Sequence, residues 1–277
     1  MMKKTLLALL ALPCVLYLAA MGWLWFYQEK LLFQPTTLPA NFAILPAPDV
    51  KEVTVPVPGA QLSVLHSKAA SSKGANGAKG VVFFLHGNGG NVDTWFPDPD
   101  FYRSHQMDVV LMDYRGYGKS TGQIESEAQL RADVRAVWQH FAPQYAGKKK
   151  MVLGRSLGTA LAAGLAVELA QQGQPADATI LISAYESMEK LALAQYPWVP
   201  SAVLRYPLRT QESVAALRSP LLLIHGQADT LIKPSHSQVL QKLAPQSKLV
   251  LVPNAGHNNL QEFEPYLQAI RDEMVRL

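Results

Sequence analysis

The sequence predicts a three-layer α/β domain with a mostly parallel central sheet, preceded by an apolar N-terminal helix. Short, wholly apolar runs recur along the chain and helix-like segments separate them, which is the pattern of repeated strand–helix units. An uncharged stretch at the N-terminus predicts the separate helix. The chain has 277 residues, of which 49% are hydrophobic, so it is long enough for a large core and too apolar to be disordered.

Residues 1–28 are predicted to form an uncleaved transmembrane anchor. No residue from Thr5 to Gln28 is charged, and roughly 20 apolar residues suffice to cross a bilayer. Lys3 and Lys4 place the N-terminus in the cytoplasm, so we expect the rest of the chain on the far side, the periplasm of a bacterial inner membrane. The far end carries an aromatic belt typical of a membrane interface, formed by Trp23, Trp25 and Tyr27.

A cleaved signal peptide is the alternative for this segment. The small residues of "YLAA" offer a cleavage site, although a signal peptide usually has an apolar region of only about 7 to 15 residues. The apolar run continues through "MGWLWFY" beyond that site, which favours the anchor. Residues 29–50 include the proline-spaced stretch "QPTTLPANFAILPAPD" and are predicted to be a connector that lies over the domain.

The α/β domain is predicted to occupy residues 51–277. It opens with a hairpin of "VKEVTVPV" and "QLSVLHS", joined through Pro58 and Gly59. Six apolar runs follow, each typical of a strand buried on both faces of a parallel sheet: "VVFFLHG", "DVVLMDYRG", "KMVLGRS", "ATILISA", "PLLLIHG" and "KLVLVPN". The helix candidates between and after them include "SEAQLRADVRAVWQHFA", "SHSQVLQKLA" and, at the C-terminus, "LQEFEPYLQAIRDEMVRL".

The pentapeptide "GRSLG" at residues 154–158 matches the G-x-S-x-G nucleophile elbow, in which a strained turn between a strand and a helix holds a serine. The run "MVL" before it and the small residues of "LGTALAAGLAVELA" after it supply the strand–turn–helix order that the motif requires. Ser156 is therefore the candidate nucleophile. The alternative is an ordinary helix cap beside glycines that only let the backbone turn.

A serine nucleophile needs an imidazole to accept its proton and a carboxylate to orient that imidazole. Loops that follow predicted strands supply Asp229 in "HGQADTLI" and His257 in "NAGHNNL", and ligands of such sheets bind at these strand ends. The order Ser156, Asp229, His257 is that of α/β-hydrolases. Asp113 is the rival acid, but it precedes the serine and opens "DYRGYG", so we interpret it as structural. Five other histidines are interpreted as surface or packing residues: His66, His105, His140, His225 and His236.

An oxyanion hole needs two preorganised backbone N–H donors. Leu157, the residue after the candidate nucleophile, supplies the first. The second is predicted at Asn88, in the loop "HGNGG" after the strand "VVFFL", with Gly89 as the next choice. The side chain of Asn88 then either shapes this loop or binds the substrate.

The sequence argues against nucleic acid, a nucleotide cofactor and a metal. The net charge of +4 is small, and the one dense basic run, residues 148–150, precedes a predicted buried strand. "HGNGGNV" lacks the third glycine of a dinucleotide-binding motif, and "DYRGYGKST" lacks the first glycine of a P-loop. No cluster of His, Cys and Asp has metal-site spacing, and the single cysteine, Cys14, excludes an intramolecular disulfide. The oligomeric state stays open.

The segments "FFLHGNGGN", "DYRGYGKSTG", "GRSLGTA", "HGQADTLI" and "GHNNL" together closely resemble the α/β-hydrolase superfamily, in particular its Bem46-like branch of membrane-anchored serine hydrolases. The resemblance extends from about Gln28 to the C-terminus and includes "QEKLLFQP" after the apolar helix. It implies an α/β-hydrolase fold and a serine-dependent hydrolysis that needs no cofactor. The site residues that it implies are Ser156, Asp229 and His257, with the amides of Asn88 and Leu157 as oxyanion donors.

The branch includes lipid esterases and protein depalmitoylases, and some members are called peptidases. We expect this chain to hydrolyse an acyl ester or thioester of a small-molecule or lipid-like substrate. A serine peptidase and a non-catalytic binding protein are the alternatives. The insertion at about residues 185–219 is predicted to be a cap, whose aromatic residues either suit an acyl group or merely pack onto the sheet.

Overall fold

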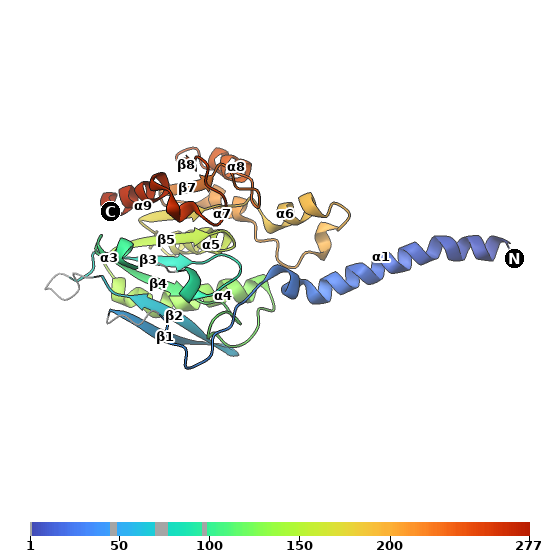
Figure 1. The fold of residues 1–277 in the computed structure, drawn as a ribbon, viewed down its shortest axis with the longest axis horizontal. Coiled ribbons are helices and arrows are strands. Elements are labelled where there is room, and N and C mark those ends of the chain that lie inside the picture. Colours follow the sequence, from blue (N-terminus) through green and yellow to red (C-terminus); the bar gives the residue numbers. More distant parts are fainter. Residues whose placement is uncertain (1, 45–48, 70–76, 96–98) are drawn as a thin grey trace.

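A computed structural model describes residues 2–44, 49–69, 77–95 and 99–277 of the protein. One sheet lies between helices that cover both of its faces, and a long N-terminal helix projects away from this body (Figure 1). The predicted architecture of a mostly parallel sheet flanked by helices is therefore confirmed. Half of the segment "SKAASSKGANGAKG" between the hairpin and the next strand, residues 70–76, lies outside the described residues.

The sheet has eight strands in the described part of the chain, in the order β1-β2-β4-β3-β5-β6-β7-β8. The predicted hairpin is present, and its second strand pairs antiparallel with β4. The strands from β3 to β8 pair in parallel, so their carboxyl ends all meet at one edge of the sheet. The strand bounds are β1 Val50–Val57, β2 Ala60–Ser67, β3 Gly80–Leu85, β4 Met107–Met112, β5 Lys149–Arg155, β6 Ala178–Ile182, β7 Leu221–Gly226 and β8 Lys248–Val252.

The prediction that "KLVLVPN" is buried on both faces was wrong. This run forms β8, an edge strand that pairs only with β7. Lys248 is exposed, and the three residues after it are only partly buried. An apolar run reports the hydrophobicity of a strand, whereas its place in the sheet depends on the path of the whole chain.

Two sets of helices cover the sheet. The helices α4, α5, α7 and α8 pack on one face, and α2, α3 and α9 pack on the other. The helix bounds are α1 Met2–Leu32, α2 Val92–Trp95, α3 Pro99–Arg103, α4 Glu127–Phe141, α5 Gly158–Gln171, α6 Met188–Gln195, α7 Thr210–Ala216, α8 Ser235–Leu243 and α9 Glu264–Arg276. Short 3₁₀ helices are η2 Ala142–Tyr145, η3 Ser201–Val203 and η4 Leu260–Glu262.

The C-terminal run "LQEFEPYLQAIRDEMVRL" does not form one continuous helix. It divides into η4 and α9, with the extended residue Phe263 between them. Pro265 explains the division, because a proline inside a helix removes one backbone hydrogen bond and clashes with the preceding turn. In the first turn of α9 the same proline is well tolerated.

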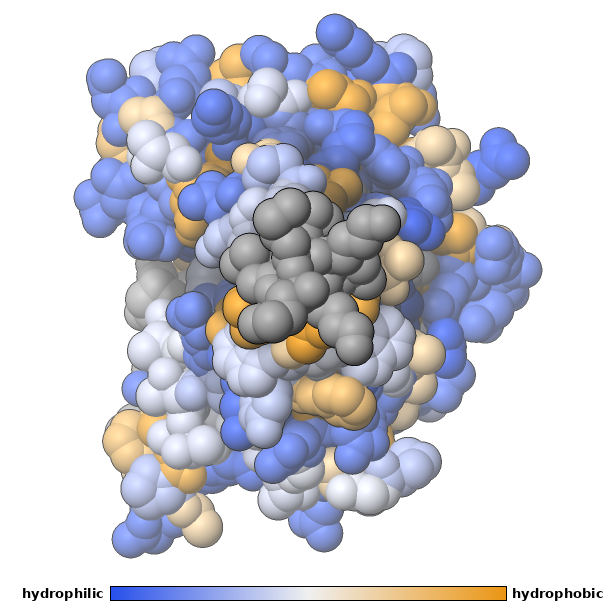
Figure 2. Space-filling view, turned by 90° about the vertical axis from the view of Figure 1, so that its right-hand side faces the viewer, coloured by the Kyte–Doolittle hydropathy of each residue, from blue (hydrophilic) through white to orange (hydrophobic). Residues whose placement is uncertain are grey.

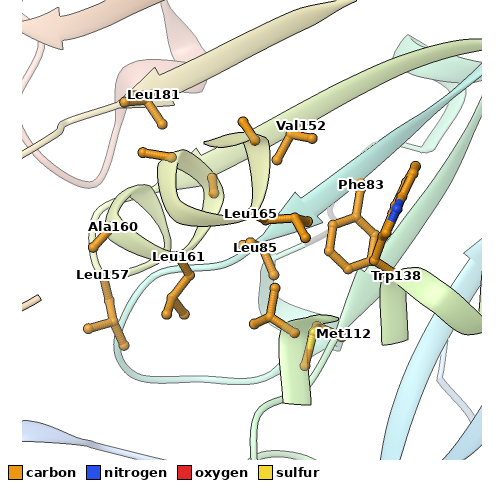
Figure 3. Packing of buried hydrophobic residues seen from close by; sticks show 14 of the residues in the cluster. Phe83, Leu85, Met112, Trp138, Val152, Leu157, Ala160, Leu161, Leu165 and Leu181 are labelled. Carbon is orange, nitrogen blue, oxygen red and sulfur yellow. The ribbon is translucent and has the colours of Figure 1, made fainter. Parts of the chain in front are cut away.

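The helix α5 lies at the centre of the larger core. Leu161 and Leu165 of this helix belong to the same buried cluster as Leu85 of β3 and Val152 of β5, and Leu157 joins the cluster just before the helix begins (Figure 3). Most α5 residues are buried, which matches its small and apolar composition. Because α5 begins immediately after Ser156, this packing fixes the position of the candidate nucleophile.

The helix α1 extends well beyond the body of the molecule (Figure 1). Residues Ala11–Leu32 are long and apolar enough to cross a membrane, and few of their side chains are buried. Figure 2 views the molecule nearly along this helix and shows that most of the surrounding surface is polar. In the insertion between β6 and β7, η3 contacts α1 while α7 packs against α5.

Candidate active site

The structure forms the predicted elbow between β5 and α5. Ser156 has a φ of +51°, in the left-handed region that non-glycine residues adopt at a cost of about 1–3 kcal/mol. Its N–H donates to the Ile182 carbonyl (2.8 Å), and its carbonyl accepts from the Thr159 hydroxyl (2.7 Å). These bonds hold the strained turn, so the hydroxyl of Ser156 lies at the carboxyl edge of the sheet.

The two glycines of the elbow allow the strands and α5 to approach each other closely. A Cβ atom at Gly154 would collide with the carbonyl oxygen of Gly158, and one at Gly158 would collide with the carbonyl oxygen of Leu85. These obstacles are backbone atoms, which cannot move away as a flexible side chain can. The spacing G-x-S-x-G is therefore a packing requirement of this turn.

Ser156, His257 and Asp229 lie in one hydrogen-bonded chain, although more than 25 residues separate each from the next in sequence. The Nε2 atom of His257 is 3.0 Å from the Oγ atom of Ser156, and its Nδ1 atom is 2.7 Å from the Oδ2 atom of Asp229. The loops after β5, β7 and β8 supply the three side chains. One imidazole thus bridges a hydroxyl and a buried carboxylate.

Asp229 is held in place by more than the imidazole. Its Oδ1 atom accepts hydrogen bonds from the backbone N–H groups of Leu231 (3.0 Å) and Ile232 (2.8 Å). Burial by itself would raise the pKa of Asp229, but the interactions with His225, His257 and the Ile232 amide outweigh it and hold this pKa well below its usual range. The carboxylate therefore stays ionised.

Residues 76–210 match the family described as Hydrolase_4, serine aminopeptidase, S33. An uncharacterized protein of Mycobacterium tuberculosis is 30% identical over 94% of both chains. The protein bem46 of Schizosaccharomyces pombe is 26% identical over 92% of this chain and 88% of its own length. An uncharacterized membrane protein of Saccharomyces cerevisiae is 30% identical over 70% of both chains.

The chain is a Bem46-like α/β-hydrolase. Solved structures agree on the fold: an esterase of Pyrococcus furiosus superposes with a TM-score of 0.67 at 20% identity, covering 88% of this chain and 98% of its own. In this α/β-hydrolase no group of three or more His, Cys, Asp or Glu side chains could hold a metal ion, as far as the described residues extend.

The two predicted oxyanion donors of the hydrolase come from the elbow and from the loop after β3. The backbone N–H of Leu157 precedes α5, and that of Asn88 belongs to the loop after β3. Neither N–H has an acceptor within the described part of the chain. Both are free to donate to a ligand.

The sequence left two roles open for the side chain of Asn88, shaping its own loop or binding the substrate. The hydrogen bonds of this side chain support the first role. Its Oδ1 atom accepts from the Tyr117 hydroxyl (2.8 Å) and from the backbone N–H groups of Gln34 (3.0 Å) and Gly89 (3.1 Å). Its Nδ2 atom donates to the Leu32 carbonyl (2.7 Å). Both polar atoms of the amide therefore form hydrogen bonds within the protein, including bonds to the end of α1 and to the residues after it.

Asp113 does not join the hydrogen-bonded chain around His257. Its Oδ1 atom accepts from the Val92 N–H (2.9 Å) and lies 3.5 Å from the Nε2 atom of His86. Burial raises the pKa of Asp113, opposed by His86. This environment fits the structural interpretation of the residue.

Sequence reasoning missed two contributors to the site. His225 was interpreted as a packing residue, yet its Nε2 atom lies 3.4 Å from the Asp229 carboxylate. The segment after α1 was expected only to lie over the domain, yet Pro35 and Thr37 form parallel bridges to Gly90 and Gly118. The position of His225 at the end of a strand was a usable signal, whereas no sequence pattern marks the two bridges.

Proposed function

We propose that this α/β-hydrolase is a membrane-anchored serine hydrolase that cleaves an acyl ester or thioester through Ser156, His257 and Asp229. The observation that carries the proposal is the pair of distances from the imidazole of His257, 3.0 Å to the Ser156 hydroxyl and 2.7 Å to the Asp229 carboxylate. A base within hydrogen-bond reach of a hydroxyl, and oriented by a carboxylate, is the arrangement that activates a serine.

Each residue of the proposed site has its own role in the reaction. The Oγ atom of Ser156 attacks the carbonyl carbon while His257 Nε2 accepts its proton, and the carbonyl oxygen becomes an oxyanion that the N–H groups of Asn88 and Leu157 bind. When the tetrahedral intermediate collapses, His257 gives the proton to the departing alcohol or thiol and an acyl-serine remains. Water then attacks the acyl-serine with His257 again as base, which releases the acid and restores the hydroxyl.

Asp229 orients the imidazole throughout this cycle. Its hydrogen bond to Nδ1 leaves Nε2 directed at Ser156 and stabilises the imidazolium that forms at each proton transfer. The backbone donors on its second oxygen keep the carboxylate from turning away. Because its pKa is held low, Asp229 remains a charge partner and does not itself take the proton.

The proposed anchor is residues 1–28, followed by a connector at 29–50, a catalytic domain at 51–277 and a cap within about 185–219. The helix α1 has 31 residues, so it is about 46 Å long, enough for the roughly 30 Å of a bilayer core. We propose that its N-terminus faces the cytoplasm and that the catalytic domain faces the periplasm of a bacterium. The apolar, exposed surface of Ala11–Leu32 supports membrane insertion.

The test uses the full-length protein in detergent with Ser156→Ala as the blank. A fluorophosphonate probe should label the wild type and not the variant, and matched acyl esters and thioesters should turn over faster than aminoacyl amides in kcat/KM. Absence of labelling in a folded protein would refute the serine mechanism. The amide arm tests the second candidate, a serine peptidase, which the description of the matching family favours. Amide rates at or above the ester rates would establish it instead.

A further inference from the structure

A pocket of about 480 Å³ adjoins the candidate active site. Its lining includes Asn88 and Gly89 from the loop of the proposed oxyanion donor, Arg155 before the proposed nucleophile and Asn258 after the proposed base. Gly87 separates it from Ser156, since a Cβ atom there would lie 3.2 Å from the Ser156 Cβ and against the Trp95 ring. The volume falls in the range of small-molecule sites. The walls are largely apolar and include Phe84, Trp95, Phe101 and Leu267.

Arg155 brings a positive charge into this apolar pocket. The side chain lies over the ring of Trp95, 5.2 Å from its centre, and only 8% of the residue is exposed. One terminal nitrogen donates to the His257 carbonyl (3.1 Å), but the Nε atom is buried and has no hydrogen-bond partner among the described residues. No carboxylate of the described residues forms an ion pair with this guanidinium.

Arg115 is a buried arginine elsewhere in the same chain, and it is paired with a carboxylate. It is 5% exposed, and Asp133 accepts two hydrogen bonds from it, at 2.6 and 2.9 Å. A buried charge without such a partner is costly, because it loses its hydration and receives little in exchange. Arg155 therefore has the chemistry of a binding group whose anion comes from outside the chain.

Two further polar groups face the same pocket. The residue Tyr266 is buried, and its hydroxyl makes no hydrogen bond to another described residue. Burial raises the pKa of Tyr266, and the charge of Arg155 opposes that rise. The Oε1 atom of Gln261 is buried without a partner, while its Nε2 atom donates to the Asn258 carbonyl (2.8 Å). The pocket thus offers a cation, a hydroxyl donor and an acceptor.

We propose that this pocket binds an oxyanion, a carboxylate or a phosphate, carried on an apolar stem of the substrate. Arg155 is the charged anchor and the Tyr266 hydroxyl is a second donor, while the aromatic walls take the stem. The planar guanidinium, with several N–H groups still unused, matches the geometry of either oxyanion. The inference rests on the proposed hydrolase function for its link to turnover, and it names anionic esters as the preferred substrate class.

The first test compares esters that differ only in charge. One pair is 1-octanoylglycerol and its 3-phosphate, and the other is 4-nitrophenyl hexanoate and 4-nitrophenyl hydrogen adipate. The wild-type protein should favour the anionic member of at least one pair, mainly through KM, and the better pair distinguishes phosphate from carboxylate. Arg155→Gln should reduce that preference about tenfold to a hundredfold, the range for a hydrogen bond to a charged group. An unchanged preference in the variant overturns the proposal.

Two further variants separate recognition from a general loss of structure. Tyr266→Phe removes only the hydroxyl and should lower the same preference about threefold to tenfold. Arg218→Gln removes an exposed arginine just before β7, at the opposite edge of the sheet from Ser156, and should leave the preference unchanged. An equal fall in Arg218→Gln would show that the preference reflects overall charge, which also overturns the proposal.

The second test does not depend on turnover. Calorimetry with full-length Ser156→Ala should detect binding of phenyl phosphate or of benzoate, and adding Arg155→Gln should weaken it at least tenfold. Binding without any ester hydrolysis by the wild type would refute the proposed function and support the anion site. Absence of binding to both compounds would refute the anion site, whatever the esterase assays show.

Discussion

The outer and inner parts of the N-terminal segment differ in both composition and contacts. The outer part, Ala11–Tyr27, has no charged residue, and most of its large side chains face outward, with Phe26 76% and Leu18 67% exposed. In the inner part, Gln28–Leu38, Gln28 is 8% and Phe33 is 6% exposed. The inner part carries Glu29 and Lys30 and packs on the domain through selected side chains, whereas most of the outer part makes no such contact.

The contacts of the inner part connect the insertion between β6 and β7 with the loop that contains Asn88. Gln28 bonds to the Val203 carbonyl (3.0 Å) and to the Arg205 N–H (2.8 Å), and Glu29 accepts from the Tyr206 hydroxyl (2.7 Å). These bonds reach the insertion between β6 and β7. The following residues hold Asn88, so the inner part connects this insertion to the oxyanion loop. It therefore holds two segments near the candidate active site and also continues into the proposed anchor.

The largest expected effect comes from truncating the chain at two points. Deletion of residues 1–27 should leave a soluble protein with nearly wild-type kcat, because these residues hold no part of the oxyanion loop. Deletion of residues 1–38 should lower kcat more than about 100-fold, since it frees Asn88 and removes the bridges to Gly90 and Gly118. Both proteins are assayed on the ester panel after circular dichroism has verified folding. Equal activity of the two truncated proteins would show that the inner part contributes no more to turnover than the outer part.

A point substitution should reproduce part of this loss. Asn88→Ala keeps the proposed backbone donor but removes all the side-chain bonds that fix it, so we expect kcat to fall about 10- to 100-fold with little change in KM. Gln34→Ala is the matched control, because the Gln34 side chain is exposed and its backbone N–H still reaches position 88. An unchanged kcat in Asn88→Ala would show that the loop is rigid without these bonds.

Two phenylalanines allow a matched test of stability. Phe33→Ala removes a buried ring that packs edge-on against Tyr206, and we expect it to lower the free energy of unfolding by about 3 kcal/mol. Phe26→Ala removes an exposed ring and should change it by less than about 0.5 kcal/mol in detergent. Thermal unfolding of both variants in the same detergent measures the difference. Similar losses would mean that the outer part packs on the domain in solution.

The smallest expected effect is at a side-chain hydrogen bond of the outer part. The Tyr17 hydroxyl donates to the Trp198 carbonyl (2.9 Å) in an exposed position, so Tyr17→Phe should cost less than about 1 kcal/mol and leave kcat unchanged. Gly22→Ala, at a position with open space around it, serves as the control for a change in the same helix. A marked loss of activity in Tyr17→Phe would extend the inner part's supporting role to the outer part.

The sequence by itself determined the secondary structure of the catalytic domain and the order of the candidate site residues. Six apolar runs predicted β3 to β8 because burial between helices demands apolar side chains, a local and readable requirement. The glycines around Ser156 were readable for a similar reason, since the turn has no space for a Cβ at either position. Such constraints act on a residue and its immediate neighbours, so they restrict the residue types at those positions and can be recognised from the sequence.

The tertiary structure alone decided which distant residues meet. The edge position of β8, the bonds of Asn88 to Leu32 and Gln34, and the placement of Arg155 in an apolar pocket follow from the path of the whole chain. Asn88 and Leu32 are 56 residues apart, and neither side chain type specifies the other. A hydrogen bond of this kind depends on distance and direction in space, which apolar periodicity does not encode, so the support of the active site by the end of α1 became visible only in three dimensions.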